Sequence, residues 1–266
     1  MGIMKRFTNE IKDAWKESKG TLYVYFTLRF LIIVCLVLQI LRRDLQNVLI
    51  CALSLVLLLL PFFIEKYLKI ELPSVLEIIA MLFVFSAQIL GEINNFYGFI
   101  PHWDTILHTL TGFLMGAIGF SLFDILNTNL KSINLSPLFL CLFAFCFSMT
   151  VGVVWEFYEY GMDEIFKTDM QKDVYVSRVN TVTLDPKKDN NVVNVDEINK
   201  VVVYDKNENK LAVLDGYLDI GLKDTMKDLM VNFLGAIIFN ILGYLYLKNR
   251  EKYSYVEKIM IKRKEA

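Results

Sequence analysis

Six apolar runs of about 20 residues constrain the fold of this 266-residue chain more than any other feature. A helix needs about 20 consecutive apolar residues to cross the hydrocarbon core of a bilayer, so each run is long enough to span one. A mean hydropathy of +0.43 and a hydrophobic fraction of 55% also favour a membrane protein over a soluble domain. We therefore predict an all-α polytopic membrane protein with about six transmembrane helices. They cover approximately residues 22–41, 46–64, 73–91, 105–126, 137–159 and 223–247.

The segment between the fifth and sixth runs has a different, more polar character. Residues 174–184 alternate apolar and polar side chains enough to predict a strand. Residues 201–204 and 211–214 flank a polar turn and predict a hairpin. We therefore predict a small β-rich insertion over 166–220. It could cap a site at the helix ends, or it could be a tolerated loop insertion, and the sequence leaves both readings open.

Lysine and arginine residues near the helix ends predict the orientation of the spans. They crowd the N-terminal flank, the loops after the second and fourth runs, and the C-terminal tail, whereas the opposite short loops hold only Arg42 and Arg43. By the positive-inside rule, both termini are cytoplasmic and the insertion is extracytoplasmic, so we expect a multi-pass protein of the plasma membrane. Residues 1–20 combine apolar residues at three- and four-residue spacing with lysines, which is typical of a helix lying on an anionic membrane surface.

The predicted domain organisation follows from these patterns. It comprises an interfacial amphipathic helix (1–20), five transmembrane helices (21–165), an extracytoplasmic β-rich insertion (166–220), a sixth transmembrane helix (221–250) and a basic cytoplasmic tail (251–266).

Charge and cysteine content exclude two classes of function. The net charge is -1 and the basic residues lie at the termini, so there is no basic stripe on a folded face that would predict nucleic-acid binding. The four cysteines all lie inside apolar runs without the spacing of a zinc site, which indicates small reduced hydrophobic residues rather than a disulfide framework.

Polar residues recur at the predicted outer ends of four of the helices. Glu156 and Glu159 are three residues apart and share one helix face. Asp104 and His108 are four residues apart, as are Asp224 and Asp228. The candidate metal-binding residues are Glu92, Asp104, His108, Glu156, Glu159, Asp224 and Asp228, and the candidate catalytic residues among them are His108, Glu156 and Asp228.

Two interpretations of this set are open. Asp104 and Asp224 could be caps, because acidic residues are favourable at helix N-termini. His108, Asp228 and Asn232 are harder to explain in this way, since they lie one to three turns inside a span. An acid there costs roughly 2.5–3.5 kcal/mol unless it is partnered or hydrated. We therefore predict a shared site, with separate caps and solvated helix ends as the alternative.

A shared site would bring several carboxylates and one imidazole together, and these carboxylates would repel one another in a low dielectric. A divalent cation relieves that repulsion, and a carboxylate-rich set with one histidine suits Mg, Mn or Ca, or Fe or Zn. A protonated carboxylate network, as in a proton-coupled carrier, is the other solution. No phosphate-binding glycine loop, nucleophile elbow or zinc-protease motif is present to name a reaction.

These motifs resemble the YjdF-like bacterial inner-membrane proteins, an uncharacterised polytopic family. The resemblance covers roughly residues 85–165 and 220–240, and Glu92 matches a glutamate that the family has near the end of the preceding span. Thr105 stands where the family has arginine, which removes an anion contact, and the long insertion differs from the short family members. The resemblance implies membrane location, the fold and the clustering of these residues, but no reaction. The matching motifs are Asp104-x3-His108-x3-Gly112, Trp155-Glu-x2-Glu159, and Asp224-Thr-x2-Asp228 with Gly235.

The leading functional hypothesis is a metal-dependent membrane hydrolase or transferase acting on a lipid or lipid-linked group at the outer face. The alternatives are a proton- or cation-coupled carrier that uses the same acids, and a non-catalytic structural or regulatory membrane protein. A carrier would need polar residues toward the cytoplasmic end as well. Gln88, His108, Asp228 and Asn232 all lie in the predicted outer half, which favours a one-sided site.

Overall fold

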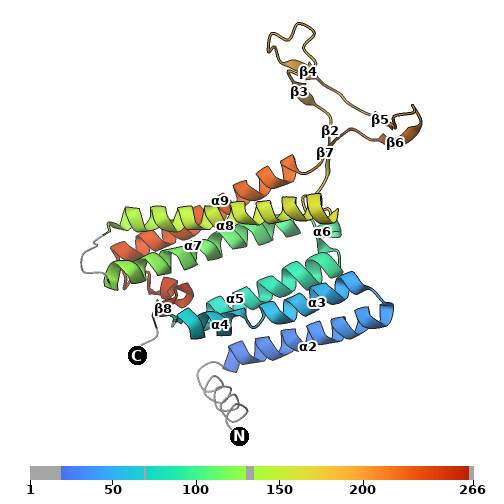
Figure 1. The fold of residues 1–266 in the computed structure, drawn as a ribbon. Coiled ribbons are helices and arrows are strands. Elements are labelled where there is room, and N and C mark those ends of the chain that lie inside the picture. The colour runs from blue at the N-terminus through green and yellow to red at the C-terminus, as the bar shows by residue number, and fades with distance from the viewer. Residues whose placement is uncertain (1–18, 69, 130–134, 264–266) are drawn as a thin grey trace. The chain divides into compact units, whose positions relative to one another are not determined.

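The computed structural model describes residues 19–68, 70–129 and 135–263, and Figure 1 shows the course of the chain. The chain divides into two compact units. The membrane unit comprises residues 1–152 and 231–266, and the insertion unit comprises residues 153–230. The amphipathic helix predicted over residues 1–20 lies almost entirely outside the described residues.

Among the described residues, six helices are long and apolar enough to cross a bilayer, which confirms the predicted number. The fifth extends to Phe166 rather than to the predicted residue 159. A short helix, α6 (Phe96–Phe99), precedes the fourth span. The spans are α2 (Lys19–Arg42), α3 with α4 (Leu45–Leu57 and Leu60–Leu68), α5 with the π-helix η1 (Ser74–Val84 and Phe85–Ile93), α7 (Trp103–Asn129), α8 (Pro137–Phe166) and α9 (Leu222–Lys248).

The second span is interrupted because it contains a proline. Helix α3 ends at Leu57, and α4 starts at Leu60 with Pro61 in its first turn, where the missing N–H of proline costs least. At the other end of α3, the carboxylate of Asp44 accepts a hydrogen bond from the Asn47 N–H at 3.1 Å and caps the helix.

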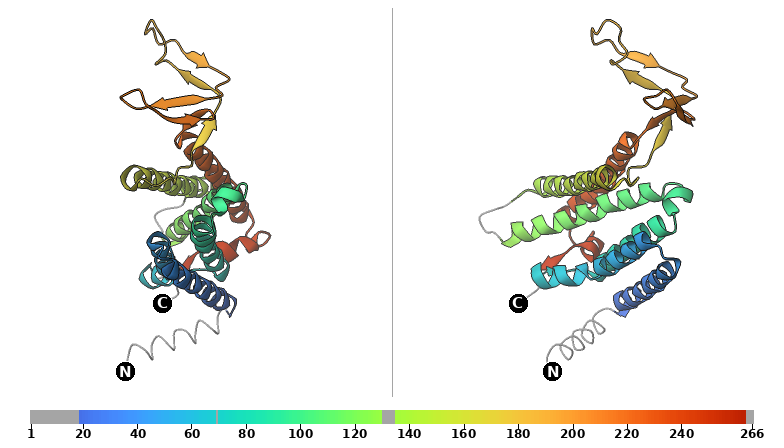
Figure 2. Two further views of the ribbon diagram at one scale, coloured as in Figure 1. Left: turned by 90° about the vertical axis from the view of Figure 1, so that its right-hand side faces the viewer. Right: turned by 45° about the vertical axis from the view of Figure 1, so that its right-hand side comes forward.

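Helices α2, α3, α5 and η1 pack together in the membrane unit, and Figure 2 shows them side by side. Their outer faces expose large apolar side chains such as Phe30 and Leu41, as expected where the surrounding medium is lipid. Between these helices lies a buried apolar cluster of Leu28, Ile32, Cys51, Leu58, Met81 and Ile89.

Small residues bring α7, α8 and α9 into close contact within the membrane unit. A Cβ added at Gly112 would overlap the carbonyl oxygen of Asn232, and one added at Gly235 would overlap that of Thr109. The Ser148 hydroxyl on α8 donates a hydrogen bond to the Gly112 carbonyl at 2.8 Å. Without a hydrophobic driving force in lipid, such backbone contact and interhelical hydrogen bonding hold membrane helices together.

Further along α7 and α9, aromatic rings fill the interior. The Phe239 ring lies 5.3 Å from that of Phe113 and 5.8 Å from that of Phe120, measured between centroids. Phe120 and Phe239 are completely buried. Two buried polar side chains, Asn240 and Ser121, also lie in this part of the interior, and the Asn240 amide donates to a carbonyl of its own helix at 2.7 Å. The interior beyond the small-residue contact is therefore mostly apolar.

The C-terminal segment is packed into the membrane unit, whereas the sequence predicted only a basic tail over 251–266. A 3-10 helix, η2 (Ser254–Ile259), buries Val256 completely. The Ile261 N–H donates to the Ser121 hydroxyl at 3.0 Å. A short strand, β8 (Lys262–Arg263), then pairs with β1 (Ile70–Glu71). The five basic residues of 251–266 led to the prediction of a tail, whereas its apolar residues make the contacts.

Replacing Val256 with aspartate is expected to destabilise the protein by about 3 kcal/mol, because it places an unpaired charge in a fully buried position. The same substitution at the neighbouring Tyr255, which is half exposed, should change stability little. Thermal unfolding of both variants in detergent measures the difference. Equal melting temperatures would show that the C-terminal segment does not dock.

The insertion consists of three two-stranded antiparallel ladders among the described residues. Strands β5 (Val201–Tyr204) and β6 (Lys210–Leu214) form the predicted hairpin. The single strand predicted over 174–184 is wrong. It is split into β2 (Val174–Val176), which pairs with β7 (Tyr217–Asp219), and β3 (Val179–Thr181), which pairs with β4 (Val193–Val195). The split occurs because the two halves have different partners, which an alternating pattern does not reveal.

Asp185 organises the loop that follows β3. Its carboxylate accepts hydrogen bonds from the N–H groups of Lys187, Asp189 and Asn191 at 3.1, 2.9 and 3.0 Å. These donors favour the charged form and lower the pKa of the Asp185 carboxyl below its ordinary value. The resulting stabilisation is therefore present above the unfolded-state pKa and is lost as the pH falls through the lowered one.

Candidate functional site

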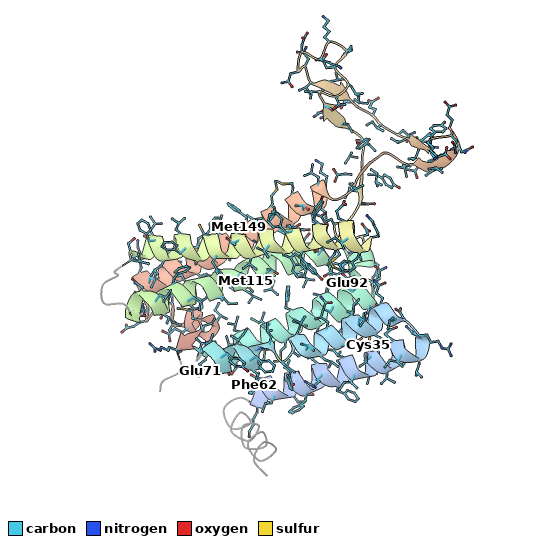
Figure 3. All side chains as sticks on the ribbon, in the orientation of Figure 1. Cys35, Phe62, Glu71, Glu92, Met115 and Met149 are labelled. Atoms are coloured by element: carbon cyan, nitrogen blue, oxygen red, sulfur yellow. The ribbon has the colours of Figure 1, made fainter. Side chains whose placement is uncertain are left out.

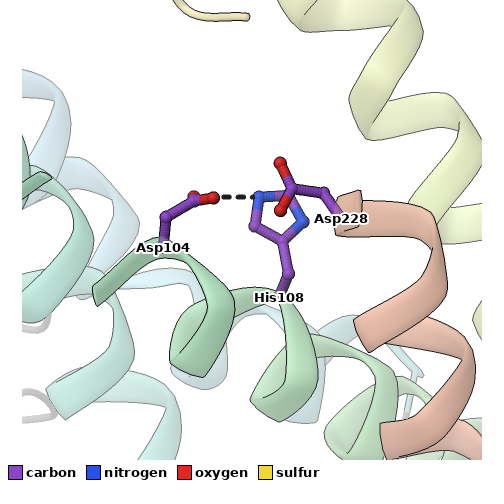
Figure 4. Close-up of side chains that lie close together, drawn as sticks. All are labelled: Asp104, His108 and Asp228. Carbon is purple, nitrogen blue, oxygen red and sulfur yellow. Dashed lines mark ion pairs between the residues drawn. The ribbon is translucent and has the colours of Figure 1, made fainter. Parts of the chain in front are cut away.

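The first predicted site residues lie on the opening turns of α7. Asp104 is in the first helical turn and His108 follows one turn later, so both side chains leave the same side of the helix. The Nε2 atom of His108 is 3.3 Å from Oδ1 of Asp104, and the dashed line in Figure 4 marks this ion pair. A carboxylate at one ring nitrogen orients an imidazole whose other nitrogen binds a metal or transfers a proton.

Glu156 and Glu159 continue the buried face of α8. Only 4% of Glu156 and 7% of Glu159 is exposed, whereas the intervening Phe157 is 69% exposed. The spacing of three residues therefore places both carboxylates on one face, as predicted. The indole Nε1 of Trp155 donates a hydrogen bond to Oε1 of Glu159 at 2.8 Å. Trp155 thus positions one of the carboxylates.

On α9, Asp224, Asp228 and Asn232 form a buried polar stripe with a spacing of four residues. Asp228 and Asn232 are each 1% exposed. The amide nitrogen of Asn232 lies 3.6 Å from the Met149 sulfur, and its amide oxygen has no hydrogen-bond partner in the part of the chain that the structure describes. A buried amide oxygen of this kind points to a water molecule or an ion nearby.

Lys227 is a site residue that the sequence interpretation missed. Its Nζ atom lies 3.6 Å from Oδ1 of Asp224 and 3.5 Å from Oδ1 of Asp228. The spacing from Asp224 of three residues along a helix could have revealed it. The side chain is 45% exposed, so this ion pair is partly screened by solvent. Lys227 nevertheless offsets part of the negative charge on α9.

Asp224 also anchors the insertion. Its Oδ2 accepts a hydrogen bond from the Lys172 N–H at 2.9 Å, and the Gln171 amide donates to the Thr225 hydroxyl at 2.5 Å. Both contacts tie the start of the insertion to the start of α9 within the insertion unit. They give Asp224 a structural role, which agrees with the alternative interpretation that it caps the N-terminus of the helix.

Glu92 differs from the other candidate residues because it is exposed. It lies near the end of the π-helix η1 and is labelled in Figure 3. The remaining candidates are buried or half-buried. Burial therefore makes Glu92 the weakest candidate ligand of the set.

A family described as predicted membrane proteins, DUF2238, matches residues 23–249. The chain belongs to DUF2238. The match includes all the candidate site residues and agrees with the expected resemblance to an uncharacterised polytopic membrane family. No curated protein and no solved structure matches the chain. DUF2238 membership and the six apolar helices establish a protein associated with the lipid bilayer, and they leave its activity to be inferred from the site.

Proposed function

We propose that His108, Glu156, Glu159 and Asp228 converge on one divalent metal ion, with Asp104 orienting His108. The four proposed ligands offer one imidazole and three carboxylates. Carboxylates with a single imidazole suit Mg, Mn or Ca, or Fe or Zn.

The packing of the membrane unit supports this convergence. The Gly112 and Gly152 positions both contact Asn232, so α7, α8 and α9 meet at one level. His108 is one turn before Gly112 on α7, and Glu156 is one turn after Gly152 on α8. One turn advances a helix by only about 5.4 Å, so helices in backbone contact at one level are still close at the next.

The observation that carries the proposal is the burial of four carboxylates. Asp228, Glu156, Glu159 and Asp224 are between 1% and 8% exposed. Burying charged groups is costly unless they are paired or bind a metal. Within the insertion unit, Lys227 supplies one positive charge to two of them. A divalent cation bound by these carboxylates would offset more of their negative charge.

A metal ion at this position supports a hydrolase or transferase acting on a lipid or lipid-linked group. The ion would act as a Lewis acid, and the second carboxylate oxygens of Glu156 and Asp228 could transfer protons. His108 would have one ring nitrogen on the metal and the other on Asp104. The mostly apolar interior around Phe120 and Phe239 favours this reading over a carrier, because a carrier needs a polar route through the bundle.

The test is turnover of lipid in nanodiscs that contain a mixture of bacterial polar lipids and lipid-linked phosphate esters. We expect wild-type protein with added Mn²⁺ to change the mass of at least one lipid, and Glu156→Gln to reduce that rate by at least about 100-fold. Glu164→Gln, on the same helix, is the control. Metal binding without any lipid turnover would contradict the enzyme and leave the cation carrier.

One observation favours a second candidate. The contacts of Lys227 with Asp224 and Asp228 compensate charge without a metal. A network of this kind suits a proton-coupled carrier or a structural role. The variant Lys227→Met distinguishes the two proposals. At a metal site, it removes a cation that competes with the metal ion for the carboxylates. In a metal-free network, it removes the cation that Asp224 and Asp228 need as a partner.

We further infer that the site faces the outside of the plasma membrane and that both termini are cytoplasmic, because basic residues crowd the termini. In a variant without the four native cysteines, a cysteine at Asn190 is expected to react with an impermeant maleimide in intact cells. A cysteine at the exposed Lys258 should react only after the cells are opened. The reverse labelling would place the site on the cytoplasmic face.

A further inference from the structure

A cavity of about 410 Å³ lies at the end of α7 and α9 where the C-terminal segment docks. It lies within the membrane unit and is separate from the acidic residues described above. Its lining combines apolar side chains, such as Ile125 and Ile261, with hydroxyl groups from Thr128 and Tyr246. The cavity could therefore hold a ligand that is partly polar and partly apolar.

The side chains that line this cavity carry a formal net charge of +1. Arg250, Lys262 and Arg263 contribute three, and Asp124 and Glu257 remove two. The Arg250 Nη2 atom lies 3.5 Å from Oδ1 of Asp124, and the Lys262 Nζ atom lies 3.7 Å from Oε2 of Glu257. These distances are longer than those of well-formed charge-assisted hydrogen bonds, so both cations can also bind an incoming anion.

The cavity lies where a bilayer surface is expected. Thr128 ends the fourth candidate span, and Arg250 follows the last residue of the sixth by two positions. Basic pockets between membrane helices at this depth bind anionic lipid headgroups. A phosphodiester carries one negative charge, which matches the net charge of the cavity, and its glycerol can contact the apolar lining. We infer that the cavity binds the phosphodiester headgroup of one anionic phospholipid.

Such a lipid would stabilise the docking of the C-terminal segment. Glu257, Met260 and Ile261 line the cavity and belong to that segment, together with the two basic residues of β8. The Tyr246 hydroxyl donates to Oε1 of Glu257 at 3.0 Å, so the helix α9 and the segment form one wall. Bound lipid should therefore raise the thermal stability of the protein.

The experiment is a titration of detergent-purified full-length protein with phosphatidylglycerol, read by native mass spectrometry and by thermal unfolding. The Lys262→Gln/Arg263→Gln double variant is expected to bind phosphatidylglycerol at least about tenfold more weakly than wild type. The Lys248→Gln/Lys252→Gln variant removes the same charge at the same end of α9, outside the cavity, and should bind as wild type does. Both variants should melt near wild type without lipid, because all four residues are exposed.

Two parallel arms identify the source of the anion. Phosphatidylcholine should bind weakly and equally to all three proteins, because it has no net charge. Inorganic phosphate should not raise the melting temperature at concentrations where phosphatidylglycerol does. Equal affinity of the two double variants for phosphatidylglycerol would overturn the proposal, as would protection by phosphate alone that equals the protection by the lipid.

Discussion

Replacing Asp228 with asparagine is expected to weaken divalent metal binding by at least about 100-fold, since even outer-shell partners of a metal site contribute 10–100-fold. Asparagine keeps the shape of the side chain and removes its charge. Asp228 is 1% exposed, so solvent cannot replace the lost ligand easily. Isothermal titration calorimetry of the detergent-purified protein with Mg²⁺, Mn²⁺, Ca²⁺, Fe²⁺ and Zn²⁺ identifies the ion and measures its affinity.

The control for this prediction is Asp185→Asn, which alters a buried aspartate that is bound by backbone N–H groups in the insertion. It should leave the metal affinity unchanged. Lys227→Met should strengthen metal binding, because it removes a cation close to Asp228. Binding should also tighten as the pH rises and the ligands deprotonate. Metal affinity that is the same in Asp228→Asn and wild type would refute this residue as a ligand.

Replacing Gly235 with alanine is expected to destabilise the protein by about 3 kcal/mol, at the upper end of the cost of overpacking. A Cβ at this position would overlap the Thr109 carbonyl oxygen and approach the Phe113 nitrogen within 2.9 Å. Both are backbone atoms, so a rotamer change cannot relieve the overlap. The helices α7 and α9 would have to separate, and His108 would move with α7.

The matched control is Gly161→Ala on α8. No atom lies within 4 Å of a Cβ placed there, and alanine favours a helix by up to about 1 kcal/mol over glycine. This variant should be as stable as wild type or slightly more so. Thermal unfolding in detergent compares the two substitutions directly. If Gly235→Ala unfolds at the same temperature as Gly161→Ala, the close contact of α7 and α9 does not exist.

The membrane helices could be predicted from the sequence because the length of an apolar run is a direct consequence of bilayer thickness. The hairpin of β5 and β6 could also be predicted, since a polar turn separates its two apolar strands. The split between β2 and β3 could not be predicted, because it depends on pairing with strands that are distant in the sequence. The docking of Val256 was also missed, since a short apolar segment among lysines gives no periodic signal.

For the candidate site, helical spacing correctly predicted that Glu156 with Glu159 and Asp224 with Asp228 lie on buried faces. Helical spacing did not distinguish Glu92, which is exposed, from the buried or half-buried candidate residues. It also missed Lys227, because a spacing pattern of acidic residues and histidine does not include the lysine that contacts Asp224 and Asp228. Sequence spacing identifies which residues share a helix face, whereas side-chain packing decides which of them are buried and how they are neutralised.

The most direct measurement is the elemental composition of detergent-purified protein after incubation with the five candidate metals and removal of excess ion. Wild type is expected to retain one divalent ion per chain. His108→Ala on α7, Glu156→Gln on α8 and Asp228→Ala on α9 should each lose it, because the proposed site takes ligands from all three helices. Retention of the full metal content in these three variants, or its absence from the wild type, would contradict a shared metal site.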